Sequence, residues 1–586
     1  MVLRTSLAIL ILLSVVRRAG EAAPPFEWWI THSLDKVRPS DPAPERIQRR
    51  AQIYAARNEF EPFQIVLRTN EAGIDGLDVE ISEFRNVTGA SIQKSFTTVY
   101  FQKLLNLPKP SSIEGSAGLW PDPLIPRIDR YEYEQRNAFP FALRPRLNQA
   151  IWIEVFVPPS AVPGIYEAEA RITKEGMALL AVPVRLTVWA FTLPETSSLR
   201  SSFGLNGTRI LKQHMGHYTS DTELYNLTRV YSVAALQHRL STHGGSAVPP
   251  KFRSVDQKIE IDWTAYDSEV GPLIEGTAIP DGEPLHGARA TSVDLRTPGD
   301  FANDGERQQY WTAWVEHFAT KNWDSELLFL YLWDEPPATD YPKVVNRGRA
   351  AHRANPGIRN LVTVPFHEQL KGIADIWVPL VNCLENKPNS ETYCDHVPPL
   401  GVYTREARDR KRLWFYQSCA SHGCSIVGGA YFVGWPQYMI DATGPANRVM
   451  QWVAWRYRVE GELYFNMVEA FGTGKDPWKT VFLFGGNGDG TLFYPGTPDV
   501  IGGRTHIPIE SIRLKLIREG MEDYEYLALL SKFRGRAVAD RYAARIVTKP
   551  YRWQSQAEAF MAVRREIGEV LDRLASARAA GRPSDE

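Results

Sequence analysis

The sequence predicts a multidomain fold: an N-terminal antiparallel β-sandwich, a (β/α)8 TIM-like barrel and a C-terminal helical segment. The chain has 586 residues, which exceeds one ordinary domain. Apolar and polar residues alternate in its first third, whereas unbroken apolar runs alternate with helical stretches in its middle part. We therefore expect a signal peptide over residues 1–23, the sandwich over 24–195, the barrel over 196–510 and a helical region with a frayed tail over 511–586.

The N-terminus has the pattern of a secretory signal peptide. It reads MVLRTSLAILILLSVV, in which Arg4 precedes an apolar run over residues 7–16. This run is too short to span a bilayer, and small residues suited to cleavage follow near residues 20–23. We expect an exported chain, with a buried N-terminal helix as the alternative. After signal removal we expect no integral membrane segment.

The sandwich prediction rests on a period of two. In AIWIEVFVP the residues Ile151, Ile153, Val155 and Val157 share one face. The segments GIYEAEARIT and VPVRLTVWAF repeat this alternation, and turns rich in Pro and Gly separate them. Alternating strands with short turns are typical of antiparallel sheets that bury one face.

The barrel prediction rests on apolar runs that do not alternate, which are typical of parallel strands covered on both faces. Helical stretches such as RQQYWTAWVEHFATK lie between them. Repeated strand–helix units favour a closed (β/α)8 barrel. The runs are LLFLYLW, RNLVTVPF, IADIWVPL, KRLWFYQS, GELYFN and GTLFYPG. The later stretch IRLKLIREGMEDYEYLALLSKF has apolar residues at helical spacing, and its charged residues are expected on a solvated face.

All four cysteines lie in one late region of the chain. In an exported protein the simplest pairing is Cys383 with Cys394 and Cys419 with Cys424, although sequence alone permits three pairings. The alternative is a metal site, because CASHGC places His422 between two thiols. That spacing matches no standard zinc pattern, so we predict disulfides and no metal.

Composition excludes some partners and leaves others open. The formal net charge of −1 gives no electrostatic reason to expect nucleic acid or an anionic membrane as partner. The chain is rich in aromatic residues, with 17 Trp, 24 Tyr and 25 Phe. Such side chains build cores, but exposed ones also stack on the apolar faces of sugar rings.

Two adjacent carboxylates are the strongest candidate for chemistry. In LLFLYLWDEPP, Asp334 and Glu335 follow seven large apolar residues, and two prolines then end the strand. Catalytic residues of parallel barrels lie at the carboxyl ends of strands. Two carboxyls in different surroundings can divide the work between a general acid and an ionised partner. The plain alternative is a pair of acids at a helix N-terminus.

Other strand ends supply candidate substrate-binding residues, for each of which an ordinary core position is the alternative. His367 and Asn466 lie at similar positions, and a lone histidine there is more often structural. The segment GGNGDGTLFYPG is expected to be a turn-rich connection rather than a calcium site. The substrate-binding candidates are Trp377, Tyr416, Trp435, Tyr464, Tyr494 and His243.

Several of these segments together resemble glycoside hydrolase family 123, and the resemblance spans nearly the whole mature chain. The N-terminal part carries ARNEFEPFQIVL, GLWPDPLIP and NQAIWIEVFVP. The barrel part carries LYLWDEP, DIWVP, VEGELYFN and NGDGTLFYPG, and the last region carries IRLKLIREGMEDYEYL. The set is specific, although each segment alone is weak.

The resemblance implies a retaining β-N-acetylgalactosaminidase that uses substrate-assisted catalysis. It implies that Glu335 is the general acid/base and that Asp334 orients the 2-acetamido group, whose carbonyl oxygen attacks the anomeric carbon. The partner would be a glycan with a β-linked N-acetylhexosamine, and no cofactor is required. One alternative is a glycosidase for a sugar without the acetamido group, with Glu385, Glu462 or Glu469 as nucleophile. The other is a carbohydrate-binding protein without turnover.

Overall fold

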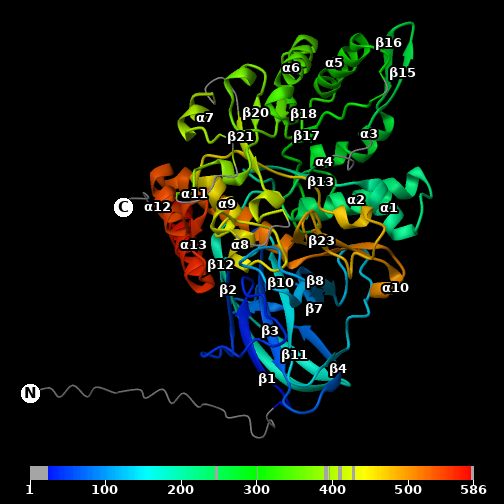
Figure 1. The fold of residues 1–586 in the computed structure, drawn as a ribbon. Helices are drawn as coiled ribbons and strands as arrows, with labels where there is room; N and C mark the ends of the chain where they lie inside the picture. The colour runs from blue at the N-terminus through cyan, green and yellow to red at the C-terminus, as the bar shows by residue number, and fades with distance from the viewer. Residues whose placement is uncertain are drawn as a thin grey trace, which may run out of the picture.

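The computed structural model places a β-sandwich below a parallel barrel, with the last helices along one flank of both (Figure 1). The predicted signal peptide lies outside the residues that the structure describes. Among the described residues, no helix has the length and apolar character that crossing a membrane requires. The described residues are 24–243, 249–299, 301–388, 394, 396–406, 412–424 and 429–581.

The N-terminal domain is a sandwich of two sheets, as its alternating pattern predicts. Every strand pair is antiparallel except β2 with β12. The first sheet has the order β1 (Glu27–His32), β3 (Glu59–Arg68), β10 (Asn148–Val157), β7 (Thr97–Leu107) and β8 (Gly118–Pro126). The second has the order β2 (Ala51–Arg57), β12 (Met177–Thr192), β11 (Gly164–Lys174), β4 (Ile74–Ile81) and β9 (Phe141–Leu143), with β5 (Phe84–Asn86) and β6 (Ser91–Ile92) at its side.

The sandwich core lies where the alternation places it. Ile151, Ile153, Val155 and Val157 of β10 all belong to the buried cluster between the two sheets. Trp152, on the opposite face of β10, joins the larger core that continues into the barrel. One strand thus serves both the sandwich core and the contact with the second domain.

The second domain is an eight-stranded parallel barrel that is nearly closed. β13 pairs with both β14 and β22, so the first and last strands are joined. β14 and β17 approach each other, but no pairing joins them among the described residues. The strands are β13 (Arg200–Gly204), β14 (Thr242–His243), β17 (Val293–Asp294), β18 (Leu328–Trp333), β19 (Asn360–Val362), β20 (Ile376–Trp377), β21 (Arg412–Tyr416) and β22 (Gly461–Tyr464).

Helices and small hairpins surround the barrel strands (Figure 1). The helices are α1 (Gly207–Met215), α2 (Asp221–Gln237), α3 (Thr264–Glu269), α4 (Gly271–Glu275), α5 (Asp304–Thr320), α6 (Tyr341–Ala354), α7 (Leu400–Glu406), α8 (Gly444–Arg448), α9 (Met450–Arg456) and α10 (Pro498–Ile501). The hairpins are β15 (Lys251–Val255) with β16 (Lys258–Asp262), β23 (Phe482–Leu483) with β24 (Gly486–Asn487), and β25 (Phe493–Gly496) with β26 (Ile507–Glu510).

One predicted barrel run lies elsewhere. GTLFYPG forms β25, which pairs antiparallel with β26 instead of joining the parallel sheet. Tyr494, Ile507 and Ile509 of this hairpin pack with Leu105 and Ile125 of the sandwich. A short apolar run is compatible with a parallel barrel strand or with a buried hairpin strand, because its composition does not identify the strand that will pair with it.

Barrel strands divide their side chains between two cores. Phe329, Leu361, Ile376, Trp414 and Leu463 form a cluster inside the barrel. The alternate residues of the same strands pack outward against the helices. This division decides which strand-end side chains can face the mouth of the barrel.

The C-terminal region is helical, with α11 (Ile512–Arg534), α12 (Arg536–Ile546), the hairpin β27 (Val547–Lys549) and β28 (Arg552–Trp553), and α13 (Ala557–Ala579). The expected solvated face of α11 is wrong. Its charged residues Arg513, Lys515, Arg518 and Glu519 are fully buried. The helix lies between the sandwich and the barrel, so charged groups of both domains pair with it.

The two predicted disulfides are confirmed. Cys383 pairs with Cys394 and Cys419 pairs with Cys424. All four thiols are used in the bridges, so none is left to form the alternative metal site with His422. The His422 side chain itself is buried. Because these cysteines follow β20 and β21, the bridges fasten two connections at the carboxyl ends of the barrel strands.

Candidate functional site

The carboxylate pair lies where β18 ends at the mouth of the barrel. Asp334 and Glu335 are both solvent-exposed, although the strand before them is largely buried. The pairing of β18 with β19 shifts register between Tyr331 and Trp333. Glu335 has a φ of 42°, in the left-handed region that side chains with a Cβ rarely adopt. An irregular strand end and a strained residue are features that re-aim side chains at functional sites.

Asp334 accepts hydrogen bonds from two neutral hydroxyl groups. The Tyr331 Oη donates to Asp334 Oδ1 at 2.8 Å, and Thr363 Oγ1 donates to the same oxygen at 3.1 Å. Thr363 Oγ1 also accepts from the Glu335 backbone N–H at 2.6 Å. Thr363 follows β19, so the neighbouring strand fixes the geometry of both acidic residues.

Glu335 is held by a different tyrosine. The hydroxyl of Tyr416, at the end of β21, donates to Glu335 Oε1. Burial and the nearby carboxylates raise the pKa of both Tyr331 and Tyr416 well above the usual value. Both phenols therefore stay protonated and act as donors. The two acids thus share one strand end, but their carboxylates accept hydrogen bonds from different side chains.

His243 lies next to this pair, as its strand-end position predicts. Its ring stacks on Tyr331, with centroids 6.2 Å apart and planes at 21°. Its Nδ1 lies 2.9 Å from Ser202 Oγ. Burial lowers the pKa of His243, which keeps the imidazole neutral at neutral pH. His243 is therefore suited to a polar contact rather than to carrying charge.

Four other predicted substrate-binding residues are not brought to the pair. Trp377 packs against Phe366 and Tyr464 against Phe203 and Tyr438, in the larger core and not in the cluster inside the barrel. The Trp435 indole donates to the Tyr431 carbonyl at 2.7 Å, and Tyr494 donates to Asp122 of the sandwich. All four side chains are buried, so they present no surface to a sugar here. For Trp377 and Tyr464 the sequence could not indicate the face, because non-alternating strands do not reveal which side is interior.

Two further candidates serve the fold locally. His367 accepts a hydrogen bond from the backbone N–H of Gln369 and packs edge-on against Tyr341. The Asn466 amide donates to Glu469 at 2.7 Å. Asp489, in the segment GGNGDGTLFYPG that was considered for calcium, is fully buried. Among the described residues no group of three or more His, Cys, Asp or Glu side chains could hold a metal.

The sequence reasoning missed four residues near the pair. Tyr331 and Thr363 contact it directly, Asp294 is the last residue of the adjacent strand β17, and Arg296 follows that strand. Tyr331 had a usable signal, because it is the polar-tipped residue three positions before Asp334 in an otherwise apolar run. β17 has only two residues, which is too short for a hydrophobic pattern to predict a strand there.

The acids considered as alternative nucleophiles have other partners. Glu385 accepts from Tyr457 and Lys549, and Glu462 accepts from Gln451 at 2.7 Å and from Tyr438. Burial raises the pKa of Glu462 to about 7. Glu469 is paired with Arg209.

A parallel barrel with two exposed carboxylates at the end of one strand gives the class of protein as a barrel-type enzyme with acidic residues at a strand end. The comparisons with known families specify it. The glycoside hydrolase 123 N-terminal domain matches residues 37–174, and the glycoside hydrolase 123 catalytic domain matches residues 291–530. These stretches together cover more than half of the chain, which belongs to glycoside hydrolase family 123 and is a glycosidase.

A solved structure agrees on the fold. A family 123 glycoside hydrolase from Clostridium perfringens, described for glycolipid glycan hydrolysis, aligns with a TM-score of 0.66 at 14% identity, covering 95% of this chain and 99% of that one. A Bacteroides ovatus xyloglucanase of family 5 aligns with a TM-score of 0.27 at 9% identity, covering 81% of this chain and 98% of that one, too weakly to carry an argument. A comparison with curated proteins finds no match.

Proposed function

We propose that this glycosidase is an exported β-N-acetylhexosaminidase that retains anomeric configuration by substrate-assisted catalysis. Its substrate is a glycan ending in a β-linked N-acetylhexosamine, with N-acetylgalactosamine as the first choice. Glu335 is the general acid/base and Asp334 the residue that orients the 2-acetamido group. The main observation behind the proposal is that the two adjacent carboxylates accept hydrogen bonds from different tyrosines, Asp334 from Tyr331 and Glu335 from Tyr416.

This arrangement suits a reaction in which the substrate supplies the nucleophile. In the first step Glu335 gives its proton to the glycosidic oxygen while the acetamido carbonyl oxygen bonds to the anomeric carbon, and the leaving group departs as an alcohol. Asp334, ionised, stabilises the positive charge that develops on the acetamido nitrogen. In the second step Glu335 removes a proton from water, which opens the cyclic intermediate at the anomeric carbon.

The surroundings of the other acids support this reading over a separate carboxylate nucleophile. Glu385 and Glu462 are engaged by residues of the outer layer, among them Lys549 and Gln451. Glu469 is tied to Arg209 and to Asn466. Asp294 lies nearer to the pair, on the adjacent strand, and is the acid to test next if substrate assistance fails.

Two features support export and a glycan of the cell surface. The N-terminal sequence has the signal-peptide pattern, and disulfides persist in oxidising compartments. The Clostridium perfringens relative is described for glycolipid glycans. We extend that substrate class to this chain as part of the proposal.

The first test compares aryl β-glycosides with and without the 2-acetamido group, using the native enzyme and Glu335→Gln. We expect hydrolysis only of the N-acetyl sugars and a loss of about 10²–10⁴-fold in kcat for the variant, smaller with good leaving groups. Circular dichroism of both proteins controls for folding. Equal hydrolysis of plain galactosides would remove substrate assistance, and full activity of the variant on a poor leaving group would remove Glu335 as the acid.

The second test addresses Asp334. Asp334→Asn keeps the shape but removes the negative charge beside the developing cation, so kcat should fall about 10²–10³-fold. The thermal midpoint should stay near that of the native enzyme, because Asp334 is exposed. Unchanged kinetics on N-acetyl substrates would exclude Asp334 from the mechanism.

A further inference from the structure

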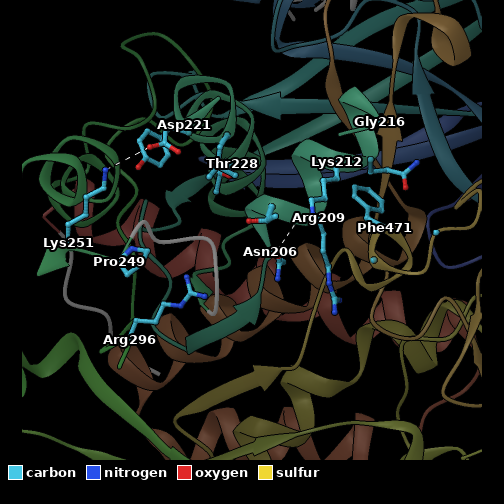
Figure 2. A pocket seen from close by; sticks show the side chains of 16 residues that line it. Asn206, Arg209, Lys212, Gly216, Asp221, Thr228, Pro249, Lys251, Arg296 and Phe471 are labelled. Atoms are coloured by element: carbon cyan, nitrogen blue, oxygen red, sulfur yellow. Dashed lines mark hydrogen bonds and ion pairs between the residues drawn. The ribbon is translucent and has the colours of Figure 1, made fainter. Parts of the chain in front are cut away.

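A pocket of about 740 Å³ opens beside the mouth of the barrel (Figure 2). It lies between α1, the start of α2, and the segments that follow β17 and β22. Figure 2 shows Lys251 and Arg296 on one side of it and Arg209 and Lys212 on the other. Phe471 and Thr228 are among the remaining lining residues.

The pocket concentrates positive charge. Four cationic side chains line it, whereas Asp221 is its one lining carboxylate among the described residues. Lys251 lies 3.9 Å from Asp221, and Arg209 pairs with Glu469 beyond the lining. Among the lining residues that the structure describes, four cations face one carboxylate, an excess of positive charge. This excess is local, because the whole chain has a formal net charge of −1.

The pocket is next to the carboxylate pair. Arg296 lies two residues after β17, the strand that pairs with β18, and Asn206 lies two residues after β13. Both therefore belong to the same end of the barrel as Asp334. The charges of Asp334 and Arg296 both act on His243, which stacks beside the pair. Arg296 therefore links the pocket to the side of the barrel mouth on which β17 adjoins β18.

We propose that the pocket binds an anionic substituent of the substrate glycan, a carboxylate or a sulfate ester, near the terminal amino sugar. This proposal rests on the proposed function of the carboxylate pair, which it deepens by naming the class of glycan. Lysine and arginine side chains supply charge-assisted hydrogen bonds to such groups. The neutral aryl glycosides used above would leave the pocket empty.

The test begins with binding, which does not depend on turnover. Glu335→Gln is titrated by calorimetry with N-acetylneuraminic acid, with sulfated N-acetylgalactosamine and with unmodified N-acetylgalactosamine. Adding Lys212→Glu should weaken binding of an anionic sugar about tenfold, and binding of the neutral sugar should change less than about twofold. Raising the salt should weaken only the anionic ligands. The two anionic arms distinguish carboxylate from sulfate.

The second readout is the ratio of kcat/KM for an anionic glycan to that for its neutral counterpart. Lys212→Glu should lower this ratio about tenfold while leaving aryl-glycoside hydrolysis unchanged, and Lys212→Ala should lower it less. The control is Lys532→Glu, the same charge change on exposed α11 surface away from the pocket. Lys212 is exposed, so neither change should affect folding.

The outcomes separate the two proposals. Anionic binding that depends on Lys212 without hydrolysis of any N-acetyl sugar would support the pocket and refute the proposed function. Hydrolysis of N-acetyl sugars with equal kcat/KM for neutral and anionic glycans, in the native enzyme and in Lys212→Glu alike, would refute the pocket alone. An equal effect of Lys532→Glu would mean that long-range electrostatics explains the change, and it would also refute the proposal that the pocket binds an anionic substituent.

Discussion

Two regions of this protein bring carboxylates close together, and their surroundings differ. At the end of β18, Asp334 and Glu335 are exposed and receive hydrogen bonds from neutral hydroxyl groups. Along α11, buried acids meet buried arginines between the sandwich and the barrel. We call the second region the α11 ion cluster, which consists of Glu61, Arg448, Glu519, Asp523 and Arg564.

Charge compensates the α11 ion cluster in part: two arginines face three acids, and burial raises the pKa of Glu61 to about 7 and that of Glu519 well above its usual value. Arg448 donates two hydrogen bonds of 2.7 Å to Asp523 and one of 3.1 Å to Glu519. Arg564 lies 2.9 Å from Asp523 and 3.3 Å from Glu61 of the sandwich. Removing these groups from water requires opposite charges in good geometry, so the cluster fixes how the two domains meet.

The difference teaches how to separate a structural acid from a chemical one. A buried acid with arginine partners is committed, because any change of its charge leaves an unpaired ion. An exposed acid with neutral donors can gain or lose a proton and still contact solvent and substrate. The β18 pair has the second arrangement, which is what general acid/base chemistry requires.

The largest expected effect breaks the α11 ion cluster. Arg448→Met leaves Asp523 and Glu519 buried without this arginine, and the free energy of unfolding should fall by about 3–5 kcal/mol. Urea denaturation measures it. The control is Arg545→Met, because Arg545 pairs with Glu566 at the surface and should contribute about 0–1 kcal/mol. Equal losses in the two variants would contradict the distinction.

Glu462 is an intermediate case, a buried acid that receives hydrogen bonds from neutral donors. Its folded-state pKa of about 7 lies above the ordinary value near 4.5. Between these pH values the unfolded chain loses the proton and the folded chain keeps it, so stability should fall as pH rises through this window. The contribution is about 3 kcal/mol.

The measurement is the free energy of unfolding at pH 5 and pH 8 for the native protein and for Glu462→Gln. Tyr438 donates to one carboxyl oxygen of Glu462 and Gln451 to the other, so the glutamine keeps one of the two acceptors and the shape of the side chain. We expect the variant to lose less stability than the native protein over this range. A parallel decline in both would show that Glu462 does not hold its proton.

The smallest expected effect concerns the neutral donors. Tyr416→Phe removes the hydroxyl that orients Glu335, and kcat should fall about tenfold, which corresponds to about 1.4 kcal/mol. Stability should change little, since the ring remains. Steady-state kinetics on an N-acetyl aryl glycoside measures the effect, with Tyr403→Phe as control, because the Tyr403 hydroxyl contacts the Phe366 backbone. A loss as large as that of Glu335→Gln would mean that Tyr416 takes part in proton transfer itself.

The features that the sequence determined are those that depend on residues close to one another in the chain. The period of two in β10 and the unbroken run before Asp334 follow from which faces of a strand are buried. The adjacent cysteines could pair locally, and they do. Asp334 and Glu335 were recognisable because two acids and two prolines interrupt a buried run. All of these signals lie within a few residues of one another.

The tertiary structure decided what depends on distant segments. It placed Trp377 and Tyr464 in the larger core, brought Tyr331 and Tyr416 to the carboxylates, and buried the charged face of α11. A parallel strand is apolar on both faces, so its sequence does not reveal which face lines the barrel. A helix with charged residues exposes or buries them according to the partners that the rest of the chain supplies, and only the assembled fold contains those partners.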